Sequence, residues 1–244
     1  ARLYGGHLVA QALRAAALTL PEDRWPHSLH AYFLQPGDFS TPLDYAVDFR
    51  RDGGAFSVRR VVGSQDGTPL IEMQVSGSVP FDDPLPHDGP PAVPPPEELA
   101  PVQESLRDFG DELDGWWVRD RPFELRYVGD PPRLAAETST SGEGTSQLWI
   151  RAIGDVPDDP SLHQCLLAYI SDAAILDPVV AELPAVARRG SGGLASLDHS
   201  MWFHGVPDVT RWMHYAQSAL GATSRRALAV GEICDETGQA VCTV

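Results

Sequence analysis

The sequence predicts an α+β protein built from two repeats, each a long helix combined with a curled antiparallel β-sheet. Two observations support this fold class. Residues 80–101 hold nine of the 22 prolines, which excludes a central strand or a helix interior and divides the chain into two parts of similar size. The same order of elements then recurs in both parts, with a helix before an aromatic strand. We therefore expect an internal duplication.

The first part predicts one helix and about four antiparallel strands. Apolar residues recur at helical spacing from Leu8 to Leu20, and Pro21 ends the pattern. The blocks HSLHAYFLQPGD, LDYAVDFRRDGGAFSVRRVVGSQDG and TPLIEMQVSGSV then alternate apolar with polar residues. Asp52-Gly53-Gly54 and Asp66-Gly67 supply hairpin turns between these strands.

The second part predicts two strands, a helix and further strands. RPFELRYV and SQLWIRAIG are the two strands, and SLHQCLLAYISDAAIL is the helix. The remaining blocks align with the first part: HSLHAYFLQPGD with ASLDHSMWFHGVPD, LDYAV with MHYAQ, and VRRVVGSQDGTPL with SRRALAVGEICDETGQAV. This alignment is the basis for expecting a duplication.

One predicted strand, residues 194–205, has an unusual pair of faces. Ala195, Leu197, His199, Met201 and Phe203 alternate onto an apolar face suited to the core. The opposite face combines a tryptophan with two serines, an acid and a histidine, unlike an ordinary solvated face. The residues alone do not explain this second face.

Composition limits the classes of partner and compartment. The net charge is −16 and the chain contains no lysine, so nucleic acid and anionic membranes are poor partners. No apolar run reaches the length that spans a membrane. The cysteines Cys165, Cys234 and Cys242 lack zinc spacing and favour free thiols in a reducing cytoplasm. Arginine without lysine, with abundant alanine and proline, suggests a bacterial source.

Six blocks in order resemble the type II acyl-CoA thioesterase family, the TesB-like enzymes: GGHLVAQAL, HSLHAYFLQPGD, RRDGGAFSVRRV, LHQCLLAYISD, LDHSMWFH and ATSRRALAVGEI. The resemblance implies a double hotdog fold, with a first hotdog at 1–79, a proline-rich linker at 80–118 and a second hotdog at 119–244. Within it the two sheets pair edge to edge. It also implies a chain that continues beyond both ends given, hydrolysis of acyl-CoA without a metal or redox cofactor, and a homodimer or larger homo-oligomer.

Asp172 is the first candidate catalytic residue. On the predicted helix it shares a face with Cys165, Tyr169 and Leu176, and partial desolvation beside an apolar stripe makes a carboxylate a better base. From the residues alone, a helix cap formed by Ser171-Asp172 is an equal alternative. The resemblance favours the base, because the family's catalytic aspartate falls on this position.

Ser196 is the second candidate. The pattern alone favours an ordinary strand hydroxyl, and no GxSxG motif indicates a nucleophilic serine. The family places here a threonine or serine that holds the attacking water, together with a glutamine directly after Val244, where the given sequence ends. Asp198 and His199 lie on opposite strand faces, so we do not expect them to act as a dyad.

Two further groups could bind substrate. Gly5, Gly6 and His7 open the first helix, whose free N–H groups could form an oxyanion hole, with close helix packing as the alternative. Arg60 and Arg225, each from an arginine doublet at equivalent places in the two repeats, could hold coenzyme A phosphates, with ordinary strand charge as the alternative.

The predicted function is hydrolysis of acyl-CoA to free fatty acid and coenzyme A by an activated water. A hotdog enoyl-CoA hydratase is one alternative, although no histidine follows Asp172 within a few residues. A non-catalytic acyl-CoA-binding protein is another. Release of a thiol from acyl-CoA separates the three.

Overall fold

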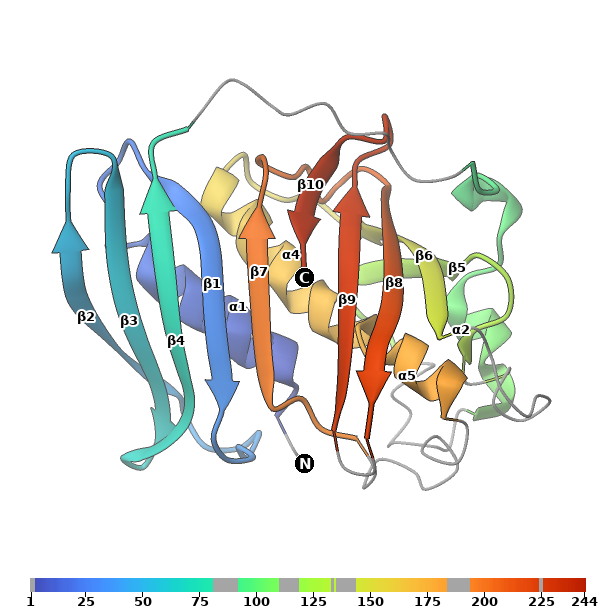
Figure 1. The fold of residues 1–244 in the computed structure, drawn as a ribbon, viewed down its shortest axis with the longest axis horizontal. Helices are drawn as coiled ribbons and strands as arrows, with labels where there is room; N and C mark the ends of the chain where they lie inside the picture. The colour runs from blue at the N-terminus through green and yellow to red at the C-terminus, as the bar shows by residue number, and fades with distance from the viewer. Residues whose placement is uncertain are drawn as a thin grey trace.

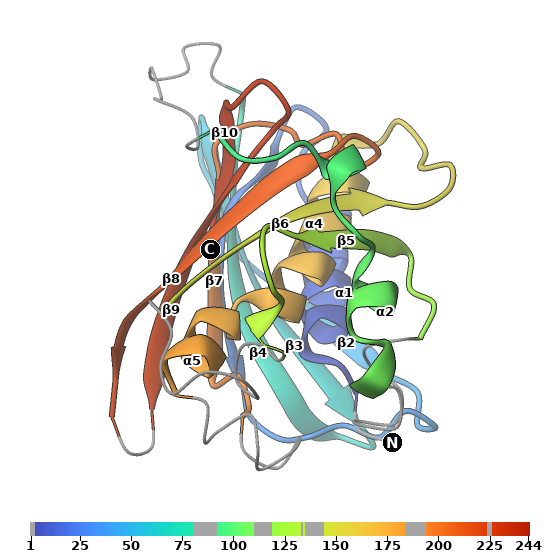
Figure 2. The ribbon, with the colours of Figure 1, turned by 90° about the vertical axis from the view of Figure 1, so that its right-hand side faces the viewer.

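The computed structural model describes residues 3–80, 92–109, 119–132, 134, 144–183, 194–223 and 226–244. The strands of this part of the chain form one antiparallel sheet in the order β2-β3-β4-β1-β7-β10-β9-β8-β6-β5. The long helices lie against one face of the sheet (Figure 1). Seen from the side, the sheet is curved and the helices lie on its inner side (Figure 2).

The elements follow the predicted order along the chain. The first half contains α1 (Gly5–Ala17), β1 (Trp25–Phe33), β2 (Asp44–Asp52), β3 (Phe56–Gln65) and β4 (Thr68–Ser78). The second half contains β5 (Phe123–Tyr127), β6 (Thr145–Ala152), α4 (Pro160–Ala174), α5 (Asp177–Glu182), β7 (Asp198–Phe203), β8 (Met213–Ala222), β9 (Ala227–Cys234) and β10 (Ala240–Thr243). The predicted helices and strands are therefore confirmed in type and order.

The predicted linker, 80–118, contains short helical turns: η1 (Pro96–Glu98), α2 (Val102–Ser105) and η2 (Arg107–Phe109). Val102 and Leu106 are buried in the core, so this segment packs on the protein where it is described. Residues 81–91 and 110–118 of the linker lie outside the described part of the chain. Helices of one turn carry too few residues to show a period of 3.6, so the sequence did not indicate them.

The strand predicted at residues 194–205 is shorter in the structure. β7 begins at Asp198, and its buried residues are His199, Met201 and Phe203, as the alternation predicts. Leu197 was expected in the core, but 57% of it is exposed, because it lies in the bend that enters the strand. Asp198 is exposed while His199 is buried, which confirms that they occupy opposite faces.

The two halves meet at the centre of the sheet, where β1 pairs with β7 and Leu29 lies opposite Met201. Outward from this junction the orders mirror each other, β4-β3-β2 on one side and β10-β9-β8 on the other. The predicted edge-to-edge pairing of the sheets is therefore confirmed. Helices α1 and α4 pack against each other on the inner side of the sheet.

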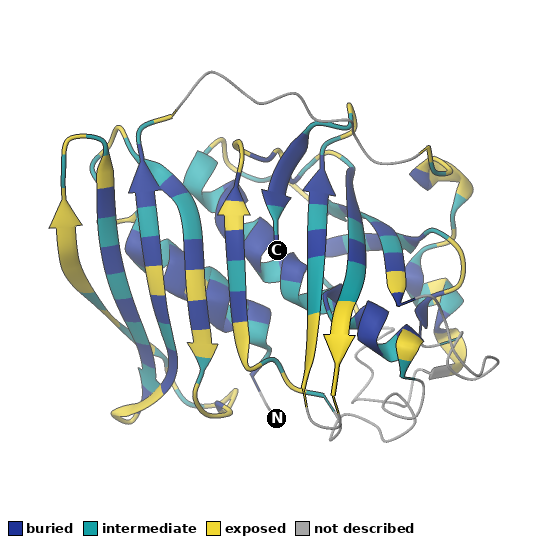
Figure 3. Cartoon of the chain, in the orientation of Figure 1, coloured by how far each residue is buried: buried dark blue, intermediate teal, exposed yellow. Residues whose placement is uncertain are grey.

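The core lies between these helices and the sheet, and the central strands alternate buried and more exposed residues (Figure 3). The segment Pro160–Glu182 is, among the described helices, the one long and apolar enough to cross a membrane by length and composition. Because 67% of its most apolar window is buried inside the protein, it has the environment of a core helix.

Candidate active site

Asp172 lies in the last turn of α4 and faces the first turn of α1. Its Oδ2 atom is so close to Gly5 that a Cβ atom added there would lie 2.7 Å from it. The same added atom would lie 3.2 Å from Cζ of Phe33, the last residue of β1. The carboxylate therefore sits where α1, α4 and the end of β1 meet, and only glycine leaves it this space.

Ser196 joins Asp172 at this point. It lies two residues before β7, and its hydroxyl donates a hydrogen bond of 3.1 Å to Oδ1 of Asp172. The two residues come from different elements, 24 positions apart, and the fold brings together the pair that the sequence singled out. A carboxylate next to a hydroxyl can hold and deprotonate one water molecule between them.

The first turn of α1 lies next to this carboxylate. His7 donates its N–H to the carbonyl of Tyr4 at 3.1 Å, and α1 has no side-chain cap at its start. The N–H groups of Gly5 and Gly6 have no acceptor among the described residues. Since the amino end of a helix also carries partial positive charge, these two groups can stabilise a developing oxyanion.

The two predicted oxyanion residues, Gly6 and His7, differ in whether their backbone N–H group has an acceptor among the described residues. Gly6 has a free N–H, whereas the backbone N–H of His7 already has an acceptor. The His7 ring accepts a hydrogen bond from Nε2 of Gln11 at 2.9 Å, and burial lowers its pKa, so the imidazole is neutral. Gly5, predicted to contact substrate, is the other residue with a free N–H.

Close packing of α1 on α4 holds this arrangement. A Cβ atom at Gly6 would lie 2.2 Å from the carbonyl oxygen of Tyr169, so the two backbones touch here. The Tyr4 hydroxyl donates to the same carbonyl at 2.7 Å. The close packing proposed for the glycines is therefore present, and the oxyanion role stays a prediction.

His199 is a buried residue next to the site that the sequence did not connect with it. His199 Nε2 lies 2.9 Å from Ser171 Oγ, whose hydroxyl also lies 3.0 Å from the Ala168 carbonyl, so the two side chains share a hydrogen bond whose direction depends on the histidine tautomer. Burial lowers the pKa of His199 and outweighs the Asp172 carboxylate, which acts to raise it. The imidazole is therefore neutral. Its buried place on β7 was visible in the alternation, but its partner on α4 was not.

The predicted phosphate-binding arginines lie in different situations. Arg60 Nε is 2.7 Å from Glu72 Oε1, and its Nη1 is 3.0 Å from Asp48 Oδ2, so two carboxylates already balance its charge. The hydrogen bond to Glu72, followed by the one to Asp48, raises its pKa. Its neighbour Arg59 is buried, which confirms that the doublet faces two ways. Arg225 lies outside the described residues.

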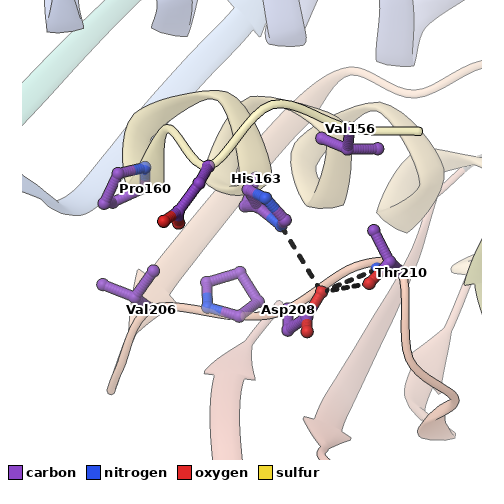
Figure 4. Close-up of a pocket in the computed structure, with 8 residues that line it drawn as sticks. Val156, Pro160, His163, Val206, Asp208 and Thr210 are labelled. Carbon is purple, nitrogen blue, oxygen red and sulfur yellow. Dashed lines mark hydrogen bonds and ion pairs between the residues drawn. The ribbon is translucent and has the colours of Figure 1, made fainter.

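A hollow of about 310 Å³ lies at the other end of α4 (Figure 4). His163 from α4 faces Asp208 there, with 3.9 Å between Nδ1 and Oδ1. Asp208 also accepts hydrogen bonds from the N–H and hydroxyl of Thr210. Neither Asp172 nor Ser196 lines this hollow, so it is separate from the candidate site.

Comparison with protein families identifies both halves of the chain. Residues 1–78 match the model of the acyl-CoA thioesterase N-terminal domain, and residues 123–244 match that of acyl-CoA thioesterase. Acyl-coenzyme A thioesterase 8 of Rattus norvegicus is 37% identical over 249 residues, covering 97% of this chain and 76% of that protein. Acyl-CoA thioesterase 2 of Haemophilus influenzae is 34% identical over 252 residues, covering 99% and 85%.

Solved structures agree. The acyl-CoA thioesterase II TesB2 of Mycobacterium marinum aligns with a TM-score of 0.79 and 34% identity, covering 98% of this chain and 85% of that one. A hotdog protein of Alicyclobacillus acidocaldarius aligns with a TM-score of 0.77 at 17% identity, covering 98% and 84%, which shows the fold alone. The chain therefore belongs to the type II acyl-CoA thioesterase family and is a hotdog-fold enzyme that hydrolyses acyl-CoA to free fatty acid and coenzyme A.

Proposed function

We propose that Asp172 is the general base of this thioesterase and that Ser196 holds the attacking water. The hydrogen bond of Ser196 to Asp172, beside the open first turn of α1, is the observation that carries the proposal. The water gives a proton to Asp172 as its oxygen bonds to the thioester carbon. The carbonyl oxygen becomes an oxyanion that the N–H groups of Gly5 and Gly6 stabilise.

The second step returns the electrons and removes coenzyme A. The carbonyl bond re-forms, the carbon–sulfur bond breaks, and coenzyme A leaves as a thiolate that takes the proton from Asp172, which restores the carboxylate. The hydroxyl group from the water stays on the acyl carbon, so the other product is the free fatty acid. Gly6 fits the oxyanion role better than His7, since the N–H of His7 has an acceptor.

A double hotdog organisation is part of the proposal. The mirrored strand orders around the β1–β7 junction, with one long helix packed on each half, support two repeats related by approximate two-fold symmetry. The domain boundaries at 1–79, 80–118 and 119–244 stay predictions from the sequence. A cytoplasmic location, a bacterial source and a homodimer or larger assembly are likewise predictions from the sequence.

Coenzyme A binding by Arg60 and Arg225 also stays a prediction. For Arg60 the two neighbouring carboxylates weaken the case, because a phosphate would have to compete with Glu72 and Asp48. The hydratase alternative is not favoured, and Nε2 of the nearby histidine His199 is hydrogen-bonded to Ser171.

The experiment that tests the water mechanism is a Ser196→Ala variant combined with mass spectrometry of the parent enzyme during turnover. We expect kcat to fall about tenfold, since the variant loses one partner of the water, and no acyl adduct on the parent protein. Ser200→Ala, on β7 and bonded to His30 away from Asp172, is the matched control. An acyl group on Ser196 would require a nucleophilic mechanism instead.

A further inference from the structure

A tyrosine hydroxyl connects the two parts of the site. Tyr4 immediately precedes α1, so its own carbonyl belongs to the peptide unit that carries the Gly5 N–H. Its hydroxyl donates a 2.7 Å hydrogen bond to the carbonyl of Tyr169, which lies three residues before Asp172 on α4. One side chain therefore spans from the proposed oxyanion donors to the helical turn that carries the proposed base.

The surroundings of Tyr4 fix its ring and its proton. The ring meets Tyr169 edge-on, with centroids 5.0 Å apart, and Tyr169 stacks on Phe123 at 6.0 Å. Burial, and then the Asp172 carboxylate, raises the pKa of Tyr4 well above its ordinary value. The phenol consequently keeps its proton and remains a hydrogen-bond donor throughout the working pH range.

The gap between the first turn of α1 and the Asp172 carboxylate is narrow. The space between Gly5 and Asp172 Oδ2 does not admit a methyl group, and Gly6 touches the Tyr169 carbonyl directly. A small shift of the α1 start would therefore change the separation between the N–H groups and the carboxylate. Displacements of about 1 Å at a reacting centre can cost on the order of a hundredfold in rate.

We infer that Tyr4 is a positioning residue for thioester hydrolysis: its hydrogen bond to the Tyr169 carbonyl sets the distance between the Gly5 and Gly6 N–H groups and Asp172. This inference rests on the proposed role of Asp172. It goes beyond the proposed oxyanion role of the first turn of α1, because it assigns the alignment of these N–H groups with the carboxylate to one hydroxyl group.

The test is Tyr4→Phe, which keeps the ring contact with Tyr169 and removes only the hydroxyl. We expect kcat to fall about five- to twentyfold while KM for acyl-CoA changes less than about twofold, since the bond aligns reacting groups rather than binding substrate. The matched variant is Tyr215→Phe. Tyr215 donates from β8 to another α4 carbonyl, that of Ser171, at 3.1 Å, and this bond does not involve α1.

Melting temperature and kcat are compared for Tyr4→Phe and Tyr215→Phe, with Asp172→Asn measured alongside. Both tyrosine variants should lower the melting temperature by a few degrees, but only Tyr4→Phe should lower kcat more than about threefold. Equal losses of kcat would overturn the inference, because any anchor of α4 would then suffice. Normal kcat in Tyr4→Phe with an inactive Asp172→Asn overturns it too, and leaves the base in place. An active Asp172→Asn overturns the proposed base itself, and Tyr4 then has no carboxylate to align.

Discussion

The two long helices begin in opposite ways. At the start of α4 the Asp159 side chain accepts hydrogen bonds from the N–H groups of Ser161 and Leu162, and so closes the helix end. At the start of α1 no side chain caps the helix, and the N–H groups of Gly5 and Gly6 stay open among the described residues. A capped helix end is stable, whereas an open one is available to a ligand.

The far ends of these helices differ in the complementary way. Counted from the first helical residue, Ala17 of α1 occupies the place that Asp172 holds on α4. One helix therefore supplies open N–H groups and the other supplies the carboxylate. Under the proposed mechanism the two helices therefore have different tasks, and among the described residues the open end of α1 meets Asp172.

The largest effect should come from removing the carboxylate. Asp172→Asn is nearly isosteric but cannot accept a proton, so we expect kcat to fall by about two to four orders of magnitude with the fold retained. Thiol release from acyl-CoA and a circular dichroism melt measure the two quantities. Turnover near that of the parent enzyme would mean that Asp172 acts as a cap and that α4 contributes no base.

The second test separates the two glycines of the open helix end. Gly5→Ala places a methyl group where the Asp172 carboxylate and the Phe33 ring lie, so these side chains must shift and we expect kcat to fall about tenfold to a hundredfold, while the helix preference of alanine offsets part of the loss of stability. Gly6→Ala meets the Tyr169 backbone carbonyl instead and should mainly lower the melting temperature. If both variants lose stability equally and keep kcat, the glycines serve packing alone.

The smallest effect should come from removing the charge at the closed end. Asp159→Asn keeps a side-chain oxygen that can cap the helix but loses the ion pair with Arg14, at 2.8 Å, and should lower the free energy of unfolding by no more than about 1 kcal/mol, which corresponds to at most roughly 2–4 °C, with kcat unchanged. The measurement is thermal unfolding followed at several pH values. A change in kcat would contradict the division of roles between the helix starts.

The difference in stability between the parent protein and Asp159→Asn should depend on pH, and the direction of this dependence can be predicted. The hydrogen bond from Ser161 is the main cause that lowers the pKa of Asp159 in the folded protein. A lowered folded-state pKa stabilises the protein above the unfolded pKa, and this stabilisation is lost as the pH falls through the folded value. The parent and Asp159→Asn melting temperatures should therefore differ near neutral pH and converge below about pH 4.

The sequence predicted what depends on local pattern. Apolar spacing located α1 and α4, alternation located the strands, and the two residues singled out as catalytic candidates, Asp172 and Ser196, lie within hydrogen-bond distance. The sequence did not reveal contacts that depend on how α1 and α4 pack, such as the bond from Tyr4 to Tyr169. The ion pairs of Arg60 were also hidden, because cross-strand neighbours are set by register rather than by residue type.

The junction between β1 and β7 has a consequence for the order of folding. His30 on β1 meets Ser200 on β7 across 170 positions of the chain. Until β7 has been synthesised, β1 has one edge whose backbone groups lack a strand to pair with, and such edges promote association between nascent chains. Closing so long a loop is also entropically slow. Completion of the catalytic site and protection of this edge are therefore the same late event in the folding of the enzyme.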